Sequence, residues 1–254
     1  MPSRELTAAL DAARLAAQVI RGFYLNHAAV RVKADGSPVT EADVQAEQVI
    51  REVLLREFPG YGFYGEETGE HALSASSVWL VDPIDGTKSF VRDCPFFATQ
   101  IALMREGELV LGVSSAPAYD EIAWAERGAG AFLNGRAVRV SAVKELKEAY
   151  VSTGNLKSLA AGAQWRPFGA LIQGVGRIRG YGDFVHYHLL ARGAVDVVIE
   201  SDVNILDIAA LTVLVREAGG TFTDLAGAAV GMATKSVLAT NGALHEKVLS
   251  ALRR

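Results

Sequence analysis

Acidic side chains that follow apolar runs are the part of this chain best suited to chemistry. The apolar run 79–81 is typical of a buried strand, and it leads directly into Asp82, Pro83, Ile84 and Asp85. Because proline restricts the backbone, both carboxylates and the carbonyl of Ile84 can face one point. Hard divalent ions such as Mg²⁺ prefer oxygen ligands in rigid geometry. The turn therefore predicts a cation site.

The residues after this turn suggest an anion beside the cation. Gly86 and Thr87 follow Asp85 at once, and backbone N–H groups at the start of a helix there would cradle an anion such as phosphate. Taken alone, a turn of this kind is as often a solvated loop as a ligand site. Metal together with phosphate is the first hypothesis.

Further acids occur in similar settings. Glu66 and Glu67 follow an aromatic run and a glycine, and neighbouring carboxylates repel each other unless they are solvated or neutralised by a cation. Asp207 begins an otherwise apolar helix, where an acid that interacts with the helix dipole is the simpler reading. Asp43 follows Thr40, a predicted N-cap, and by itself also reads as an ordinary acid of a first helical turn.

Taken together, these acids resemble the pattern of the inositol monophosphatase superfamily, which comprises Mg²⁺-dependent, typically lithium-sensitive phosphomonoesterases. The resemblance runs from about residue 33 to the C-terminus, and Leu206 stands where the family carries tryptophan. It implies an α/β (α+β) fold, a layered αβαβα sandwich of the inositol monophosphatase and fructose bisphosphatase type. The matching elements are, in order, Asp43, Glu66-Glu67, Asp82-Pro83-Ile84-Asp85-Gly86-Thr87 and Leu206-Asp207-Ile208-Ala209-Ala210.

The resemblance assigns metal ligands to five residues. It implies that Glu66, Asp82 and the Ile84 carbonyl hold one Mg²⁺ ion. Asp82, Asp85 and Asp207 would hold a second ion, so that Asp82 bridges the pair. Two Mg²⁺ ions per active site, with a third and weaker position, are therefore expected as cofactors.

The resemblance also assigns catalytic and phosphate-binding roles. Thr87 would hydrogen-bond the attacking water and be oriented by Asp43, while Glu67 would act nearby through a water molecule. The backbone N–H groups of Gly86 and Thr87 would bind the phosphate. Lys33 would lie in a loop that closes over the site and supplies the weaker metal position; a solvated lysine is an equally good reading.

The substrate is less well defined, because several phosphatases share this metal core. The segment 86–90 reads Gly-Thr-Lys-Ser-Phe, whereas inositol enzymes usually carry Gly-Thr-x-Asn-Phe and the nucleotide branch Gly-Thr-Lys-Glu-Phe. By resemblance Glu200 contacts the substrate, and Asp183 stands where inositol enzymes tend to carry a small neutral residue. Two carboxylates suit an ammonium group, which favours a histidinol-phosphate phosphatase. Inositol-1-monophosphatase, adenosine bisphosphate phosphatase and a regulatory binding role remain alternatives.

Composition excludes several classes of protein. The chain has 254 residues, 50% of them hydrophobic, which suits a single domain over 1–254 made of two packed halves, approximately 1–145 and 146–254. One cysteine rules out an intrachain disulfide. A net charge of −4 with scattered basic residues makes nucleic acid an unlikely partner, so a small phosphate ester is expected instead. Without a long apolar run we expect no membrane segment and a cytoplasmic location. The resemblance implies a homodimer.

Periodicity predicts the elements that position these residues. Helices are expected at 6–26 and from Thr40 to about residue 58, with a loop at 30–39 between them. Strands are expected at 98–104, 109–115 and 121–125, and a hairpin at 130–140 turns about Asn134-Gly135. The later part alternates strands and helices, including one helix over 156–173. His186 and His188, two positions apart on a helix, make a poor metal pair and read as surface or hydrogen-bonded histidines.

Overall fold

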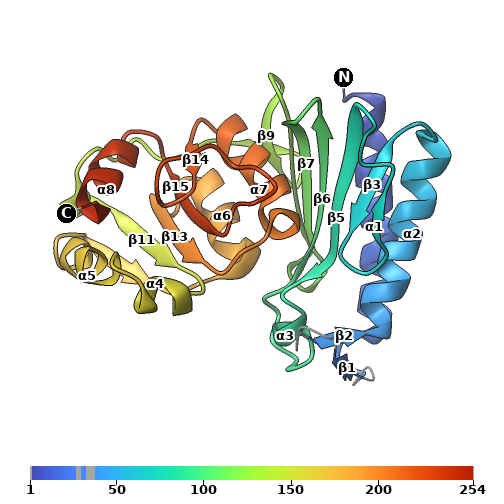
Figure 1. The fold of residues 1–254 in the computed structure, drawn as a ribbon, viewed down its shortest axis with the longest axis horizontal. Coiled ribbons are helices and arrows are strands. Elements are labelled where there is room, and N and C mark those ends of the chain that lie inside the picture. Colours follow the sequence, from blue (N-terminus) through green and yellow to red (C-terminus); the bar gives the residue numbers. More distant parts are fainter. Residues whose placement is uncertain (1, 27–29, 33–37, 254) are drawn as a thin grey trace.

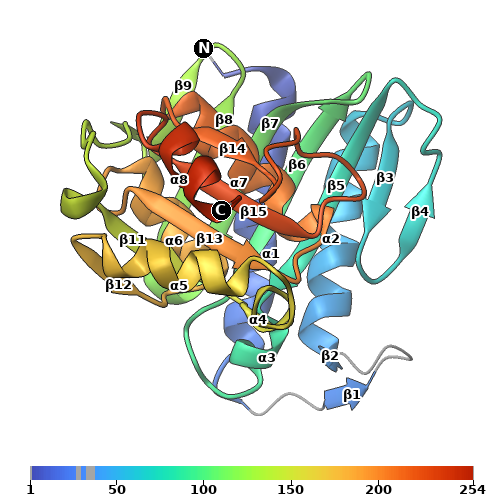
Figure 2. The same cartoon turned by 60° about the vertical axis from the view of Figure 1, so that its left-hand side comes forward.

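The computed structural model describes residues 2–26, 30–32 and 38–253, and the elements of this part stack in five layers (Figure 1). The order of the layers is helix, sheet, helix, sheet, helix, as the family resemblance implies. Figure 2 shows the last helical layer covering the outer face of the second sheet. No helix in the described part is both long and apolar enough to cross a membrane. From one side to the other, the helical layers are α1 (Arg4–Phe23) with α2 (Glu41–Glu57), then α6 (Asp183–Ala191) with α7 (Ile205–Glu217), then α4 (Lys157–Ala161), α5 (Trp165–Gln173) and α8 (His245–Leu252).

The described strands form a large sheet of eight strands, a small sheet of five and a separate two-stranded pair. In spatial order, the large sheet is β10 (Arg136–Val138), β9 (Gly130–Leu133), β8 (Glu121–Glu126), β7 (Glu108–Ala116), β6 (Ala98–Arg105), β5 (Ser77–Asp85), β3 (Gly62–Gly65) and β4 (Gly69–His71). The small sheet is β12 (Arg177–Arg179), β11 (Tyr150–Thr153), β13 (Val197–Ser201), β15 (Ser236–Thr240) and β14 (Thr221–Thr223). Strand β3 is parallel to β5, and β11 is parallel to both β12 and β13. The two halves of the chain stay a prediction, although the large sheet ends at Val138 and the small sheet begins at Tyr150.

Strand β5 is apolar throughout because it lies between two helical layers. Trp79 and Val81 pack in the core beneath α1 and α2, whereas Val78 and Leu80 pack in the core beneath α7. Successive side chains of a strand point to opposite faces, so a strand covered on both faces reads as a continuous apolar run. This burial explains the run that precedes the acidic turn.

A bulge at the end of β5 brings its two aspartates together. Asp82 pairs with Gln100 of β6, but Asp85 pairs with Ala98, so β5 contains one residue more than β6 over this stretch. In a regular strand, residues three apart point to opposite faces. The extra residue of a bulge re-aims the side chains that follow it. Asp82 and Asp85 can therefore face the same site.

Helix α7 lies against the large sheet closely enough for backbone contact. A Cβ atom added to Gly112, in the middle of β7, would lie 2.3 Å from the carbonyl oxygen of Ala210. Ala210 is one turn beyond Asp207, so the absence of a side chain at Gly112 sets how near the acidic end of α7 comes to the end of β5. The contact between Gly112 and Ala210 joins residues far apart in the sequence, so no local sequence pattern predicts it.

The structure corrects two sequence predictions. Part of the expected loop 30–39 is an antiparallel pair, β1 (Val30–Val32) and β2 (Pro38–Thr40), consistent with the alternation of valine and polar residues there. Lys33 lies outside the described residues. The helix expected over 156–173 is two helices, because the chain becomes extended at Gly162, with ψ of 171°.

We predict that Gly112→Ala destabilises the protein, because the new methyl group cannot be placed without moving α7. Overpacking of this kind costs roughly 1–3 kcal/mol. Urea denaturation measures the loss. Gly169→Ala is the control, since a Cβ at that helical position meets nothing within 4 Å and alanine favours a helix. Equal stability of the two variants would contradict the close approach of α7.

Candidate active site

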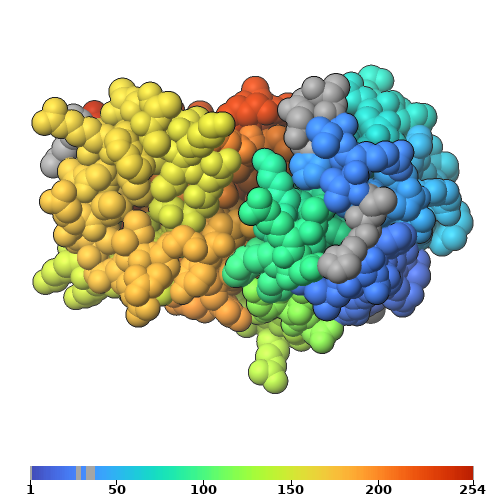
Figure 3. Space-filling model, turned by 90° about the horizontal axis from the view of Figure 1, so that it is seen from below, coloured from blue at the N-terminus to red at the C-terminus, as the bar shows by residue number. Residues whose placement is uncertain are grey.

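Three aspartates from two elements form the centre of the site. Asp82 and Asp85 come from the bulged end of β5 and Asp207 from the first turn of α7; one carboxylate oxygen of each lies within 4.8 Å of the others. Together with Glu66, just after β3, they line a cavity of about 250 Å³. Figure 3 shows this face hollowed between the green segment near residue 90 and the yellow segment near residue 155. Acids that are 125 positions apart in the chain, Asp82 and Asp207, thus meet at one point.

These carboxyl groups hold protons more tightly than ordinary ones. Burial raises the pKa of Asp82 well above its usual range, and the negative charges of Glu66 and Asp85 add to the rise. Burial and the charge of Asp207 do the same for the pKa of Asp85. Burial raises the pKa of Asp207 to about 7, helped by the charges of Glu66 and Glu200 and opposed by hydrogen bonds from Asn204. Repulsion of this kind is what a divalent cation relieves.

Neighbouring groups fix the acidic turn in place. The backbone N–H of Ile84 donates to Asp82 Oδ1 at 2.9 Å, and the hydroxyl of Thr99 donates to the carbonyl of Pro83 at 2.8 Å. The side-chain amide of Gln100 donates to Asp85 Oδ2 at 3.3 Å. The bulge is thus held from β6, by residues that the sequence did not single out. A rigid set of carboxylate and carbonyl oxygens fits a hard divalent ion such as Mg²⁺.

The same capping arrangement positions an aspartate at the start of two helices. Thr40 caps α2 and Asn204 caps α7, and in each case the side chain of the N3 aspartate accepts a hydrogen bond from the cap's backbone N–H, at 2.7 Å for Asp43 and 2.8 Å for Asp207. This confirms the predicted N-cap at Thr40. The two aspartates that read locally as ordinary first-turn acids therefore both point toward the site.

Asp43 connects α2 to the turn after β5. Its side chain is buried, and Asp43 Oδ1 lies 3.1 Å from the hydroxyl oxygen of Thr87, which also lies 3.0 Å from the carbonyl oxygen of Ile84. A hydroxyl group has one proton, so it donates to one of these acceptors at a time. When it donates to Asp43, its lone pairs remain available to accept a hydrogen bond.

Gly86 is required by both conformation and space. Its φ of +92° lies in the left-handed region, and a Cβ would lie 2.5 Å from the carbonyl oxygen of Phe96. Helix α3 (Thr87–Phe90) begins directly after it, and Gly86 and Thr87 both line the cavity beside the three aspartates. The predicted phosphate-binding residues are therefore adjacent to the predicted metal ligands.

Glu67 lies beside the site rather than in its wall, and its position depends on a residue that sequence reasoning missed. Glu66 lines the cavity, whereas the described lining does not include Glu67. Glu47 of α2 is fully buried and accepts hydrogen bonds from the backbone N–H groups of Glu67 and Thr68. Its spacing of four from Asp43 is the signal that could have identified it, because residues four apart share a helix face.

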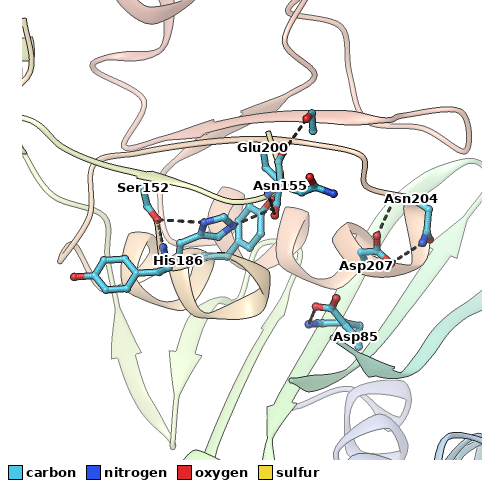
Figure 4. A network of polar contacts seen from close by, with 11 residues as sticks. Asp85, Ser152, Asn155, His186, Glu200, Asn204 and Asp207 are labelled. Carbon is cyan, nitrogen blue, oxygen red and sulfur yellow. Dashed lines mark hydrogen bonds and ion pairs between the residues drawn. The ribbon is translucent and has the colours of Figure 1, made fainter. Parts of the chain in front are cut away.

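The two predicted substrate residues, Asp183 and Glu200, also line the cavity. Figure 4 shows Glu200 close to Asn155 and His186. Glu200 Oε2 accepts hydrogen bonds from the hydroxyl of Tyr187 at 2.6 Å and from His186 Nε2 at 3.2 Å. A Cβ at Gly154 would lie 1.8 Å from Glu200 Oε1, so the carboxylate rests directly on the backbone. Burial, with the nearby charge of Glu200, raises the pKa of Asp183 to about 6.

The two histidines of α6 are buried and hydrogen-bonded, so of the two predicted alternatives, surface or hydrogen-bonded, the second is the one observed. Besides Glu200, His186 contacts the hydroxyl of Ser152, with Nδ1 and Oγ 3.3 Å apart. His188 lies 2.6 Å from Glu121 and 2.9 Å from the hydroxyl of Ser114. Neither belongs to a metal site in the described residues.

Known proteins of similar sequence and structure are phosphatases or share this fold. The inositol monophosphatase family model matches residues 2–254. The chain belongs to this family. A histidinol-phosphatase of Mycobacterium tuberculosis is 45% identical over 228 residues, covering 88% of this chain and 87% of that relative. An inositol-1-monophosphatase of Rhizobium meliloti is 38% identical, with 88% and 84% covered. The crystal structure of the extragenic suppressor protein suhB from Bartonella henselae superposes with a TM-score of 0.91 at 33% identity, covering 99% of each chain.

As a member of the inositol monophosphatase family, the chain is a metal-dependent phosphomonoesterase. The family assignment also confirms the predicted fold, because the superposition extends over nearly the whole chain. The histidinol-phosphatase and the inositol-1-monophosphatase relatives have similar sequence identity to this chain. Membership of the family therefore does not by itself distinguish the two substrates.

We predict that Asp207→Asn stabilises the metal-free protein at about pH 8 and has a smaller effect at about pH 5. The folded-state pKa of about 7 lies above the ordinary value of 3.8, so the folded protein holds a proton that the unfolded chain releases. The resulting stability is complete below the ordinary pKa and is lost as the pH rises through about 7. Asparagine stays neutral and avoids this loss.

Melting temperatures in the presence of a chelator, from pH 5 to pH 8, provide the measurement. The difference between variant and wild type should grow as the pH rises. Adding Mg²⁺ at pH 8 should reverse the order, because only the wild type keeps all three carboxylates. A difference that does not change with pH would contradict the buried-charge account.

Proposed function

We propose that the chain is a Mg²⁺-dependent histidinol-phosphate phosphatase. The observation that carries the proposal is that a pair of carboxylates, Asp183 and Glu200, lines the same cavity as the three aspartates. A phosphate ester bound at the aspartates would place its alcohol portion against this pair. An amino alcohol brings an ammonium group that can pair with the carboxylates, whereas inositol brings only hydroxyl groups. The similarity to histidinol-phosphatases supports the same choice.

Five residues would hold the ions. One Mg²⁺ would be held by Glu66, Asp82 and the carbonyl of Ile84, and a second by Asp82, Asp85 and Asp207. When bound, such ions neutralise phosphate oxygens and lower the pKa of a coordinated water. The third, weaker position near Lys33 lies outside the described residues.

The remaining residues would orient the reactants. The hydroxyl of Thr87 would hydrogen-bond the attacking water and be oriented by Oδ1 of Asp43, whose Oδ2 accepts a hydrogen bond from the backbone N–H of Thr40. The backbone N–H groups of Gly86 and Thr87 would bind phosphate oxygens, and glycine allows the close approach. Glu67 would act through a second water. These roles need no movement of the β5 turn, because Thr99 and Gln100 already fix it.

The orientation of Glu200 suits recognition of a cation. Its Oε2 is fixed by two donors from α6, and Gly154 holds Oε1 beside the backbone N–H of Asn155 at 3.4 Å. A charge-assisted contact with an ammonium group contributes on the order of 1.5–3 kcal/mol. Inositol-1-monophosphatase is the second candidate, favoured by the 38% identical relative of that activity. A homodimer stays a prediction, which light scattering can check.

We predict that L-histidinol phosphate is hydrolysed with a kcat/KM roughly tenfold to a hundredfold higher than that of inositol 1-phosphate, from the energy of one charge-assisted contact. Phosphate release from each ester, with Mg²⁺ and with a chelator, provides the measurement. Equal or reversed preference would favour the inositol reading. Phosphate release that does not need Mg²⁺ would contradict the metal assignment.

Asp183→Asn should narrow this preference by lowering kcat/KM for histidinol phosphate. Asp183 has a φ of +45°, which asparagine tolerates well, so the fold should survive. Asp202→Asn is a matched control: Asp202 also lines the cavity with a positive φ, of +59°, but its carboxylate accepts hydrogen bonds from Ser158 and Ser201. The control should keep most of the preference. The same effect from both variants would contradict a specific contact with Asp183.

A further inference from the structure

Glu47 is a buried carboxylate that lies one helical turn from Asp43 on α2 and does not line the cavity. Its side chain is fully buried, yet it forms no ion pair in the described part of the chain; its oxygens accept two backbone hydrogen bonds instead. Oε2 accepts from the N–H of Glu67 at 2.8 Å, and Oε1 from the N–H of Thr68 at 2.7 Å. Both belong to the turn between β3 and β4. Bonds from backbone N–H groups to a charged acceptor are among the stronger hydrogen bonds of a protein.

These bonds fix the backbone of the two residues that follow Glu66 in the chain. The N–H of Glu66 itself donates to the carbonyl of Val81 at 3.2 Å. Val81 is the residue of β5 that directly precedes Asp82. The residues that follow Glu66 are held by Glu47. The backbone around Glu66 is therefore held at two points. The N–H group of Glu66 bonds to β5, and the N–H groups of Glu67 and Thr68 bond to Glu47 of α2.

Packing against Gly65 makes the position of the Glu47 carboxylate specific. A Cβ on Gly65 would lie 2.4 Å from Glu47 Oε1 and 2.5 Å from its carboxylate carbon. Gly65 has no positive φ, so the close contact with Glu47 is what the absence of a side chain here allows. The carboxylate thus occupies the space that any other residue would fill.

Helix α2 therefore contacts both acidic loops through carboxylates four residues apart. Asp43 reaches Thr87 in the turn after β5, and Glu47 reaches the turn after β3. Residues at this spacing lie on one face of a helix. We propose that Glu47 is a positioning residue that sets the Glu66 carboxylate relative to Asp82, and so determines how much Mg²⁺ the enzyme needs. The proposal rests on the proposed role of Glu66 as a metal ligand.

The test uses Glu47→Gln and, as an independent perturbation from the loop side, Gly65→Ala. Glutamine has a single acceptor oxygen, so one backbone N–H loses its partner, while the alanine methyl group displaces the carboxylate. Loss of a group that orients a metal ligand typically weakens metal binding by about tenfold to a hundredfold. Both variants should therefore need at least about ten times more Mg²⁺ for half-maximal phosphate release, with most of kcat recovered at saturating Mg²⁺.

A second readout needs no substrate. The rise in melting temperature on adding Mg²⁺ to chelator-treated protein should be smaller in both variants than in wild type. Asp196→Asn is the matched control, because Asp196 is also buried and accepts a backbone hydrogen bond from Tyr150 at 2.7 Å, but it lies at the other end of β13 from Glu200. This variant should melt at a lower temperature and keep the wild-type Mg²⁺ requirement.

The outcomes separate the two claims. Glu47→Gln and Gly65→Ala with lower stability but the wild-type Mg²⁺ requirement would show that Glu47 is only structural and would overturn the proposal. If Glu47→Gln does not fold, Gly65→Ala decides alone. A wild-type protein that neither melts higher with Mg²⁺ nor needs it for phosphate release would instead overturn the proposed function, on which the inference depends.

Discussion

Repulsion between carboxylates that share one cavity is the constraint on which this structure depends. Burial and mutual charge raise the pKa values of Asp82, Asp85 and Asp207, which means that the metal-free fold holds these groups together at a cost. Two features of the fold keep these carboxylates close together despite their repulsion. The bulge of β5 turns two of the acids to one face, and Gly112 lets α7 bring the third close. The fold thus holds the three carboxylates close enough together to bind one cation.

The cavity has two walls that belong to different layers. Glu66, Asp82 and Asp85 come from the large sheet, whereas Asp183 and Glu200 come from α6 and from β13 of the small sheet. Helix α7 lies between the sheets. The groups that would hold metal and those that would face the alcohol are fixed by separate sets of hydrogen bonds. This separation fits a family in which one metal core serves several phosphate esters.

Local signals predicted a large part of this arrangement. The β5 turn, the N-cap at Thr40 and the acids at 66 and 207 could be read from sequence because each combines a chain element with the residue that ends or begins it. Their convergence was predicted only through resemblance to a family pattern, since Asp43 and Asp207 each have an ordinary explanation as a first-turn acid. The capping arrangement accounts for both readings at once, because the same carboxylate caps the helix and faces the site.

The features that escaped prediction are contacts between distant residues. The close contacts of Gly112 with Ala210, of Gly154 with Glu200 and of Gly65 with Glu47 depend on packing that no local pattern contains. The break at Gly162 was missed because the apolar spacing continues through it, and the tertiary structure decides where the helix ends. Glu47 was missed because a polar residue in an amphipathic helix reads as exposed unless the partner loop is known.

Calorimetric titration of Mg²⁺ into metal-free protein at about pH 7, in two buffers with different ionisation enthalpies, tests the central claim most directly. Carboxyl groups with raised pKa values must lose protons when a cation binds them. The account predicts saturable binding with a net release of protons to the buffer. Binding with no proton release, or no saturable binding at all, would contradict it.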